Sequence, residues 1–201
     1  MKIAKQIFNK TSHLHFPQQG LFACLLVEKM KANFDYVFYQ EKEKIEAATA
    51  ILNACFDYII AFPDTQKISL HGFWEQIEEL TPDLDEEEGA ASYAFDFCIA
   101  CYALLRLLRD FDLQELETVI EQAIATVDMF IQEYLDLDPS DPDLENKIAQ
   151  NSFMLNEVER QQALLSAVQT IKIINEEQVL QLRGMNRQFP GMVNLRIIYP
   201  S

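Results

Sequence analysis

The chain has 201 residues, of which 49% are hydrophobic and 11% aromatic, a composition that supplies a sizeable core and excludes an intrinsically disordered protein. Its 32 acidic and 16 basic residues give a net charge of −16, which disfavours direct binding to nucleic acid or to an anionic membrane. No run approaches the roughly 18 uninterrupted apolar residues of a membrane helix, and no signal peptide is recognisable, so we expect a cytosolic protein with reduced cysteines.

Three amphipathic helices are predicted in the first half of the chain. Apolar residues recur at helical spacing within 18–30, 44–62 and 69–80. Between the first two of these segments, an aromatic-rich and then charged stretch indicates a bend or a short helix. Pro63 ends the second helix, and an acidic loop follows the third.

Residues 92–109 are apolar on nearly every face of the helix that they predict. Ala94, Cys98, Cys101 and Leu105 form one stripe, and aromatic and aliphatic side chains fill the neighbouring ones. A helix that is hydrophobic all round belongs in the middle of a bundle, so we expect this helix to be central.

A long amphipathic helix over 113–135 has the clearest start signal. Asp112 is its expected N-cap, and Glu115 stands where the partner of a capping box would be. The inner face of this helix is a regular series of aliphatic and aromatic residues.

The last part of the chain is predicted to contain two further helices. Asp141 before a proline indicates the start of a helix that runs to about residue 173. Its middle, "NEVERQQA" (156–163), has few apolar residues and is expected to cross an exposed edge. Asn175 caps a last helix, and residues 192–201 are expected to form a short extended tail.

These elements define the fold class. We expect an all-α protein, a multihelical bundle of six to nine helices around the central apolar helix at about 92–109. No internal repeat, low-complexity linker or clear domain boundary interrupts the pattern, so residues 1–201 are predicted to form a single helical domain.

Several stretches resemble a known family. "FACLLVEKMKANFDY" (22–36), "SYAFDFCIACYALL" (92–105) and "TVDMFI" (126–131) are similar to the YjaG-like family of bacterial proteins, domain-of-unknown-function family 416. The C-terminal "LRGMN" and "VNLRI" within 182–197 are similar too, so the resemblance extends over about residues 15–198. It implies an all-helical cytosolic protein and carries over no activity and no functional residue.

Cys98 and Cys101 have the Cys-x-x-Cys spacing of a redox dithiol or of half a metal site. A redox pair needs an exposed thiol with a lowered pKa, whereas Cys98 lies about two turns inside the predicted helix, close to Asp96, whose charge would raise that pKa. Cys24 and Cys55 lie on apolar stripes of their own. We therefore interpret the Cys-x-x-Cys pair as part of the core.

Metal and nucleotide sites find little support in the sequence. His13 and His15 are the candidate metal ligands, although a plain loop-to-helix junction also explains them. The acidic segment 136–147 has Asp141 and Lys147 at the positions for which an EF-hand needs Gly and Glu, so helix capping is the preferred explanation there. No nucleotide-binding or hydrolase motif is present, and no cofactor is predicted.

Charge is distributed unevenly along the chain. Residues 1–44 have a net charge of +3, residues 45–145 have three bases against 24 acids and a net charge of −21, and residues 146–201 have a net charge of +2. The leading hypothesis is a non-enzymatic cytosolic interaction or adaptor protein that presents acidic helices to a basic partner. A soluble acidic surface without such a partner, or DNA mimicry, also explains the charge. The alternatives are an enzyme with an unrecognised, metal-assisted pocket and a homo-oligomer in which the basic ends dock on the acidic middle.

Three arginines near the C-terminus are the remaining site candidates. Arg183 and Arg187 share a helix face at i, i+4, and Arg196 follows in the tail. They could bind an anion, or they could pair with the acidic middle of the chain, within one chain or between subunits. We favour the pairing.

Overall fold

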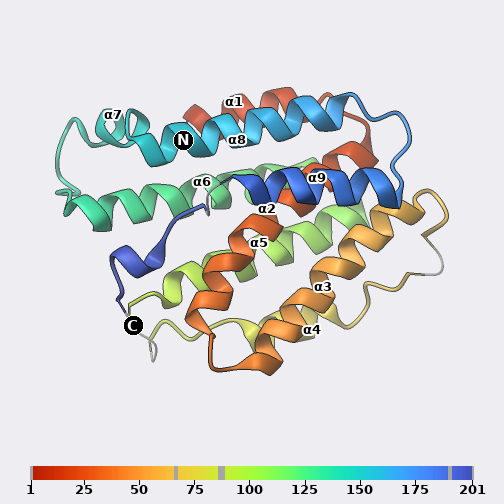
Figure 1. Ribbon diagram of the computed structural model, residues 1–201, viewed down its shortest axis with the longest axis horizontal. Coiled ribbons are helices and arrows are strands. Elements are labelled where there is room, and N and C mark those ends of the chain that lie inside the picture. The colour runs from red at the N-terminus through yellow and green to blue at the C-terminus, as the bar shows by residue number, and fades with distance from the viewer. Residues whose placement is uncertain (1, 66–67, 86–88, 190–191, 201) are drawn as a thin grey trace.

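The computed structural model describes residues 2–65, 68–85, 89–189 and 192–200, and these residues are helical with no strand among them (Figure 1). The α-helices of the described residues are α1 (Lys2–Thr11), α2 (Phe16–Val37), α3 (Lys42–Ala61), α4 (Phe73–Leu80), α5 (Ala91–Asp110), α6 (Leu113–Leu135), α7 (Leu144–Ala149), α8 (Ser152–Gln169) and α9 (Glu176–Gln188). A short 3-10 helix, η2 (Leu195–Ile197), follows in the tail that was predicted to be extended. The predicted all-α, multihelical architecture is confirmed, and α1 is a helix that the sequence patterns did not single out.

The helix α5 is an inner helix of the bundle, as its all-round apolarity predicts. It packs against α2, α3, α4 and α6, and 12 of its 20 residues are buried. By length and composition alone α5 is apolar enough to cross a membrane, but most of it lies inside the protein, which is what the central helix of a bundle requires.

The second inner helix, α2, approaches its neighbours closely at Gly20. A Cβ atom at this position would collide with Ile59 on α3 and would lie 3.0 Å from Leu108 on α5. The missing side chain therefore lets three helices meet at one point. The bend predicted after α2 occupies residues 38–41, beyond an α2 longer than the sequence pattern indicated.

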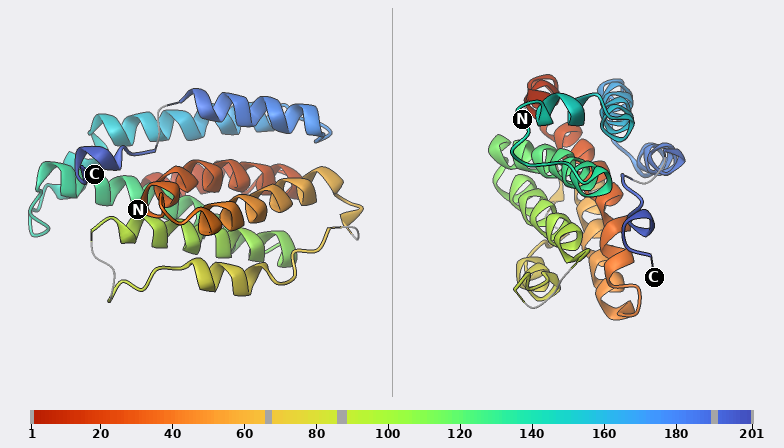
Figure 2. Two further views of the ribbon diagram at one scale, coloured as in Figure 1. Left: turned by 60° about the horizontal axis from the view of Figure 1, so that its bottom comes forward. Right: turned by 90° about the vertical axis from the view of Figure 1, so that its left-hand side faces the viewer.

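The outer helices cover opposite sides of this core. The helices α8 and α9 lie on one side, and α4 lies on the other, against α3 and α5 (Figure 2). The helix α1 packs against α6 and α8. Because α9 touches α2, α3 and α8, it closes the side of the bundle on which the polar residues described below are gathered.

The predicted single helix from Asp141 to about residue 173 is wrong. The chain instead forms α7 and α8, because the Asn151 side chain accepts a hydrogen bond from the Phe153 amide at 2.9 Å and so begins a new helix. Asp141 is not a helix cap. Its carboxylate accepts the Asp143 amide at 2.8 Å and stabilises a turn ahead of α7.

The predicted start of α6 is half confirmed. The Asp112 carboxylate accepts a hydrogen bond from the Gln114 amide at 2.9 Å, so Asp112 is the N-cap. Glu115 does not complete a capping box, because its carboxylate pairs with Arg106 on α5 at 3.0 Å. This ion pair ties α6 to α5 near their junction.

Candidate functional site

The middle of α8 carries a buried ion pair where the sequence predicted an exposed edge. Glu157 and Arg160 are 3% and 2% exposed, and Gln161 is fully buried. Arg160 donates from Nε to one carboxylate oxygen of Glu157 at 2.8 Å and from Nη2 to the other at 2.5 Å, while Gln161 donates to Glu157 at 2.7 Å. The prediction of an edge was wrong because the charges of Glu157 and Arg160 pair with each other inside the protein, although Oε1 of Gln161 accepts no hydrogen bond from a described residue.

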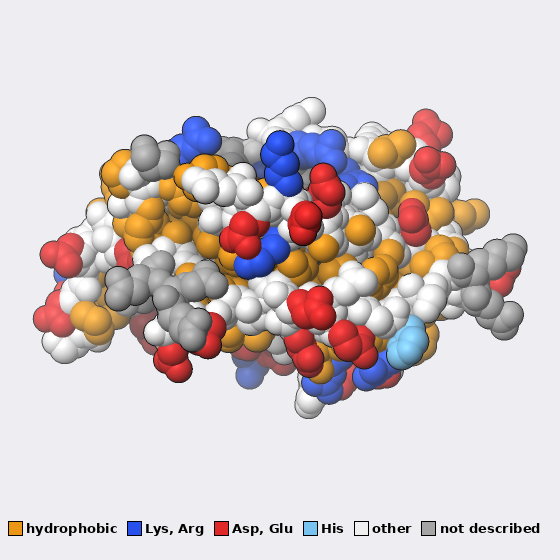
Figure 3. All heavy atoms as spheres, turned by 90° about the horizontal axis from the view of Figure 1, so that it is seen from below, with side chains coloured by type: hydrophobic (Ala, Val, Ile, Leu, Met, Phe, Trp, Pro, Cys, Tyr) orange, Lys and Arg blue, Asp and Glu red, His pale blue; other side chains and the backbone are white. Residues whose placement is uncertain are grey.

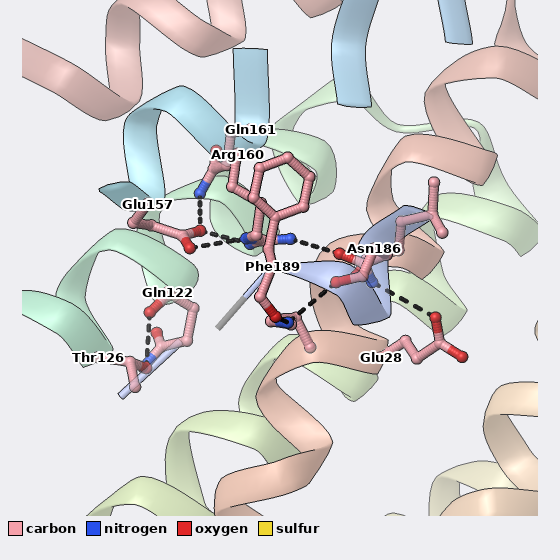
Figure 4. A network of polar contacts seen from close by, with 10 residues as sticks. Glu28, Gln122, Thr126, Glu157, Arg160, Gln161, Asn186 and Phe189 are labelled. Atoms are coloured by element: carbon pink, nitrogen blue, oxygen red, sulfur yellow. Dashed lines mark hydrogen bonds and ion pairs between the residues drawn. The ribbon is translucent and has the colours of Figure 1, made fainter. Parts of the chain in front are cut away.

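Asn186 on α9 connects this ion pair to α2 (Figure 4). Its side-chain oxygen accepts a hydrogen bond from Arg160 Nη1 at 2.8 Å. Its side-chain nitrogen donates to the Leu25 carbonyl at 2.9 Å and makes a longer contact of 3.4 Å with Glu28. One amide, itself 1% exposed, therefore holds α8, α9 and α2 together.

Lys29 on α2 is a buried cation at the C-terminal end of α9. It is 8% exposed, and its Nζ donates to the carbonyls of Asn186 at 2.9 Å and Phe189 at 2.7 Å. Carbonyls at a helix end lack partners inside the helix, so Lys29 caps them. Burial, followed by the charge of Arg160, lowers the pKa of Lys29 to about 8 against the opposing effect of two nearby carboxylates.

The two arginines that share a face of α9 meet Glu28 on α2. Arg183 donates from Nε to Glu28 at 2.7 Å and from Nη2 to Asn53 at 3.2 Å, and its guanidinium lies 4.4 Å from the centre of the Phe56 ring. The side chain of Arg187 is 69% exposed and reaches the same Glu28 oxygen only at 3.5 Å. Arg183 thus pairs within the chain, with a partner in the basic first block rather than in the acidic middle.

Two adjoining cavities are lined by the three predicted arginines. One, of about 400 Å³, has Lys29, Lys31, Arg183 and Arg187 in its wall. The other, of about 380 Å³, is lined by Arg196 and by two tyrosines of α2 and the turn after it, and both cavities share two residues of α2. The structure therefore brings the arginine candidates to one side of α2.

A further cavity, of about 610 Å³, lies beside the buried ion pair. Glu157 and Arg160 contribute to its lining together with Phe153, Phe189 and Met192. A concave, mostly apolar space with a few fixed polar groups is the usual form of a small-molecule site. Its charged groups are already paired, so the geometry by itself identifies no reaction.

Asp96 on α5 is a partly buried carboxylate, located between α5 and α6. It accepts hydrogen bonds from Gln122 at 2.5 Å and from Thr126 at 2.8 Å. Burial raises the pKa of Asp96 to about 6, although both hydrogen bonds act in the opposite direction.

Comparison with known proteins shows the family to which the chain belongs. A family model described as "Protein of unknown function (DUF416)" matches residues 6–197. The chain belongs to the DUF416 family. It is also similar to the crystal structure of a DUF416 family protein from Shewanella baltica OS155, with a TM-score of 0.78 and 22% sequence identity over 90% of this chain and 93% of that chain. No functionally curated protein matches the sequence.

Membership of the DUF416 family confirms the resemblance detected in the sequence. The likeness to the Shewanella baltica structure, at this level of identity, shows a shared fold. Neither comparison assigns an activity.

In this DUF416 protein all four cysteines are core residues. Cys24, Cys55, Cys98 and Cys101 are free thiols and none is more than 1% exposed. Burial raises the pKa of Cys55 and of Cys98 to about 12, and it raises the pKa of Cys24 and of Cys101 well above the ordinary value. Such thiols supply almost no thiolate near neutral pH, so the core interpretation of the Cys-x-x-Cys pair is confirmed.

His13 and His15 lie in the turn between α1 and α2, and both are exposed. The backbone of His15 begins α2, and its amide donates to the Gln18 side chain at 3.1 Å. In the ranges that the structure describes, no group of three or more His, Cys, Asp or Glu side chains lies close enough to hold a metal ion. The two histidines therefore stand at a loop-to-helix junction without a described partner set.

Sequence reasoning missed Lys29, Glu157, Arg160 and Asn186. A signal was present for Glu157, because it follows Met154 and continues the buried face of α8 at helical spacing. A polar residue in line with apolar ones indicates either an exposed interruption or a buried, paired group. The partners on α2 and α9 decide between them, and they are remote in sequence.

Proposed function

We propose that this DUF416 protein is a non-enzymatic cytosolic interaction protein whose acidic helices contact a basic partner. The observation that carries the proposal is the small number of internal partners for its acids. Of the 24 acidic residues in 45–145, the structure describes all except 86–88, and ion pairs within the described chain involve three: Asp110, Glu115 and Asp141. Most of the −21 charge of this block is therefore available to a partner.

The outer surface of α4 and the turn after it carries a concentrated part of this charge. Glu75, Glu78 and Glu79 on α4 are exposed, as are Asp83 and Asp85, and no base interrupts this stretch. Figure 3 views the molecule from below and shows acidic side chains in several separate groups. A partner that bears a basic patch would match these groups in charge, with an association that weakens as salt screens it.

A pull-down with graded salt tests this proposal. We expect wild-type protein to retain a basic protein at low ionic strength and to release it at moderate salt. The triple variant Glu75→Gln, Glu78→Gln and Glu79→Gln should retain much less of it. Loss of binding would follow from the removed charges, since all three side chains are exposed and their replacement leaves the core intact.

The matched control removes three exposed acids elsewhere: Glu159→Gln, Glu176→Gln and Glu177→Gln, on α8 and α9. If wild-type protein retains no basic protein at low salt, or if both triple variants lose binding equally, the acidic face is not the contact surface. Size-exclusion chromatography across the same salt series tests the homo-oligomer alternative, for which a salt-dependent change in size is expected.

A further inference from the structure

We propose that the cavity between α2, α3 and α9 binds a small molecule through its phosphate group, with Lys29, Arg183 and Arg187 as the binding residues. This site is separate from the acidic surface and does not rest on the function proposed above. The cavity has a volume of about 400 Å³.

The lining of this cavity has more positive than negative charge, in a protein whose net charge is −16. Its described lining contains four cations and two carboxylates. Lys31 holds Asp35 through contacts of 2.6 and 2.8 Å, and Arg183 holds Glu28 at 2.7 Å. These pairings leave Lys29 without an ion pair to a described carboxylate, and they leave Arg187 with only a 3.5 Å contact to the Glu28 oxygen that Arg183 already holds.

Of these two cations, Lys29 gives the stronger evidence for an anion site, because it is buried. Buried charges in proteins are normally paired with an opposite charge. Lys29 is 8% exposed, yet its described contacts are two neutral carbonyls and it forms no ion pair with a described carboxylate. Its lowered pKa, about 8, is the expected consequence of a buried ammonium beside another cation, Arg160. An anion in the cavity would supply the missing counter-charge.

Arg183 is held in position before any ligand arrives. Glu28 and Asn53 fix Nε and Nη2, and the ring of Phe56 supports the guanidinium plane. Its Nη1 makes no hydrogen bond to a described residue, so it remains free to donate. A guanidinium that is already ordered loses little entropy when it binds an oxyanion.

The charge and size of the site favour a phosphate group. Two uncompensated positive charges match the charge of about −1.5 to −2 that a phosphate monoester carries near neutral pH, whereas a single carboxylate would balance only one of them. Lysine and arginine together are common phosphate ligands. The volume lies within the range of about 300–1,000 Å³ that is usual for small-molecule sites.

Isothermal titration calorimetry at low ionic strength tests the site, with inorganic phosphate, glycerol phosphate and acetate as probes. We expect saturable binding of one equivalent of each phosphate compound and much weaker binding of acetate, whose single carboxylate balances only one of the two positive charges. Arg187→Gln should weaken phosphate binding about tenfold, the loss of one charge-assisted contact. Its side chain is 69% exposed, so this variant should fold normally.

Lys5→Gln, at an exposed position on α1, is the matched control and should bind phosphate as the wild-type protein does. The titration of the Lys29 side chain, followed by NMR, gives a second readout that needs no variant: bound phosphate should raise its pKa. Absence of saturable phosphate binding overturns the proposal. The proposal is also overturned if Arg187→Gln and Lys5→Gln weaken phosphate binding equally, or if bound phosphate leaves the pKa of Lys29 unchanged. Acetate that binds as tightly as phosphate would refute the phosphate assignment.

Discussion

Replacing Arg160 by methionine should lower the free energy of unfolding by about 3–5 kcal/mol, because it leaves Glu157 buried without its partner charge. The structure sets this magnitude. Arg160 makes two hydrogen bonds to Glu157 and one to Asn186, and at 2% exposure water cannot replace them. Methionine is long and flexible enough to fill much of the vacated volume, so the loss should come mainly from the unpaired polar groups.

Urea denaturation followed by far-UV circular dichroism measures this effect. A surface ion pair provides the control: Arg109 pairs with Asp110 in an exposed position, and Arg109→Met should lower the free energy of unfolding far less than Arg160→Met does. The double variant Arg160→Met with Glu157→Gln should recover much of the loss, because it removes the buried charge as well. An Arg160→Met cost below about 1 kcal/mol, or a double variant no more stable than Arg160→Met alone, would refute the reasoning.

Three other predictions concern the core. Burial raises the pKa of Asp96 from 3.8 to about 6, so the folded state binds this proton more tightly than the unfolded chain, and the stabilisation present at low pH is lost as the pH rises through 6. Between about pH 5 and about pH 8 this loss amounts to about 1 kcal/mol. The urea midpoint of Asp96→Asn should lack that part of the pH dependence. An identical pH dependence in the wild-type protein and in Asp96→Asn would contradict the raised pKa of Asp96. Cys98 and Cys101 should resist a bulky maleimide until the protein is unfolded, as judged by mass spectrometry, and rapid native labelling of either would restore the redox interpretation. Tyr93→Phe removes a hydroxyl that donates to a carboxylate on α6 at 2.7 Å and should lower the free energy of unfolding by about 1 kcal/mol in the same urea assay. The control Tyr102→Phe, at an exposed position, should change it by less than about 0.5 kcal/mol. Equal losses in the two variants would show that the hydrogen bond contributes nothing.

The interior position of α5 could be predicted from the sequence because it depends on a local property. A segment that is apolar on every face has no side suited to water, so it must be surrounded by other helices. The same logic identified Cys98 and Cys101 as core residues, since their spacing is that of a helix face as much as of a redox motif. Local signals also located Asp112 and Asn175 correctly as N-caps, whose carboxylate and amide oxygens accept amides within three residues.

The polar network could not be predicted in this way because its partners are far apart in the chain. Arg160 bonds Asn186, 26 residues later, and Asn186 bonds the carbonyl of Leu25, 161 residues earlier. Within α8 the polar segment around Arg160 has the composition of a solvated face. Burial of that face depends on the docking of α9 and α2, which no local pattern in α8 records.

Lys29 links the two features of the α9 side that sequence reasoning did not connect. Its Nζ caps the C-terminal carbonyls of α9, so it contributes to holding that helix in place. The same residue lines the cavity proposed to bind phosphate, beside Arg183 and Arg187, which α9 itself supplies. The positive charge of Arg160 lowers the pKa of Lys29, whereas a bound anion would raise that pKa. The docking of α9 and the binding of an anion therefore depend on the same buried charge, and an anion that stabilises that charge would also stabilise the packing of α9 against α2.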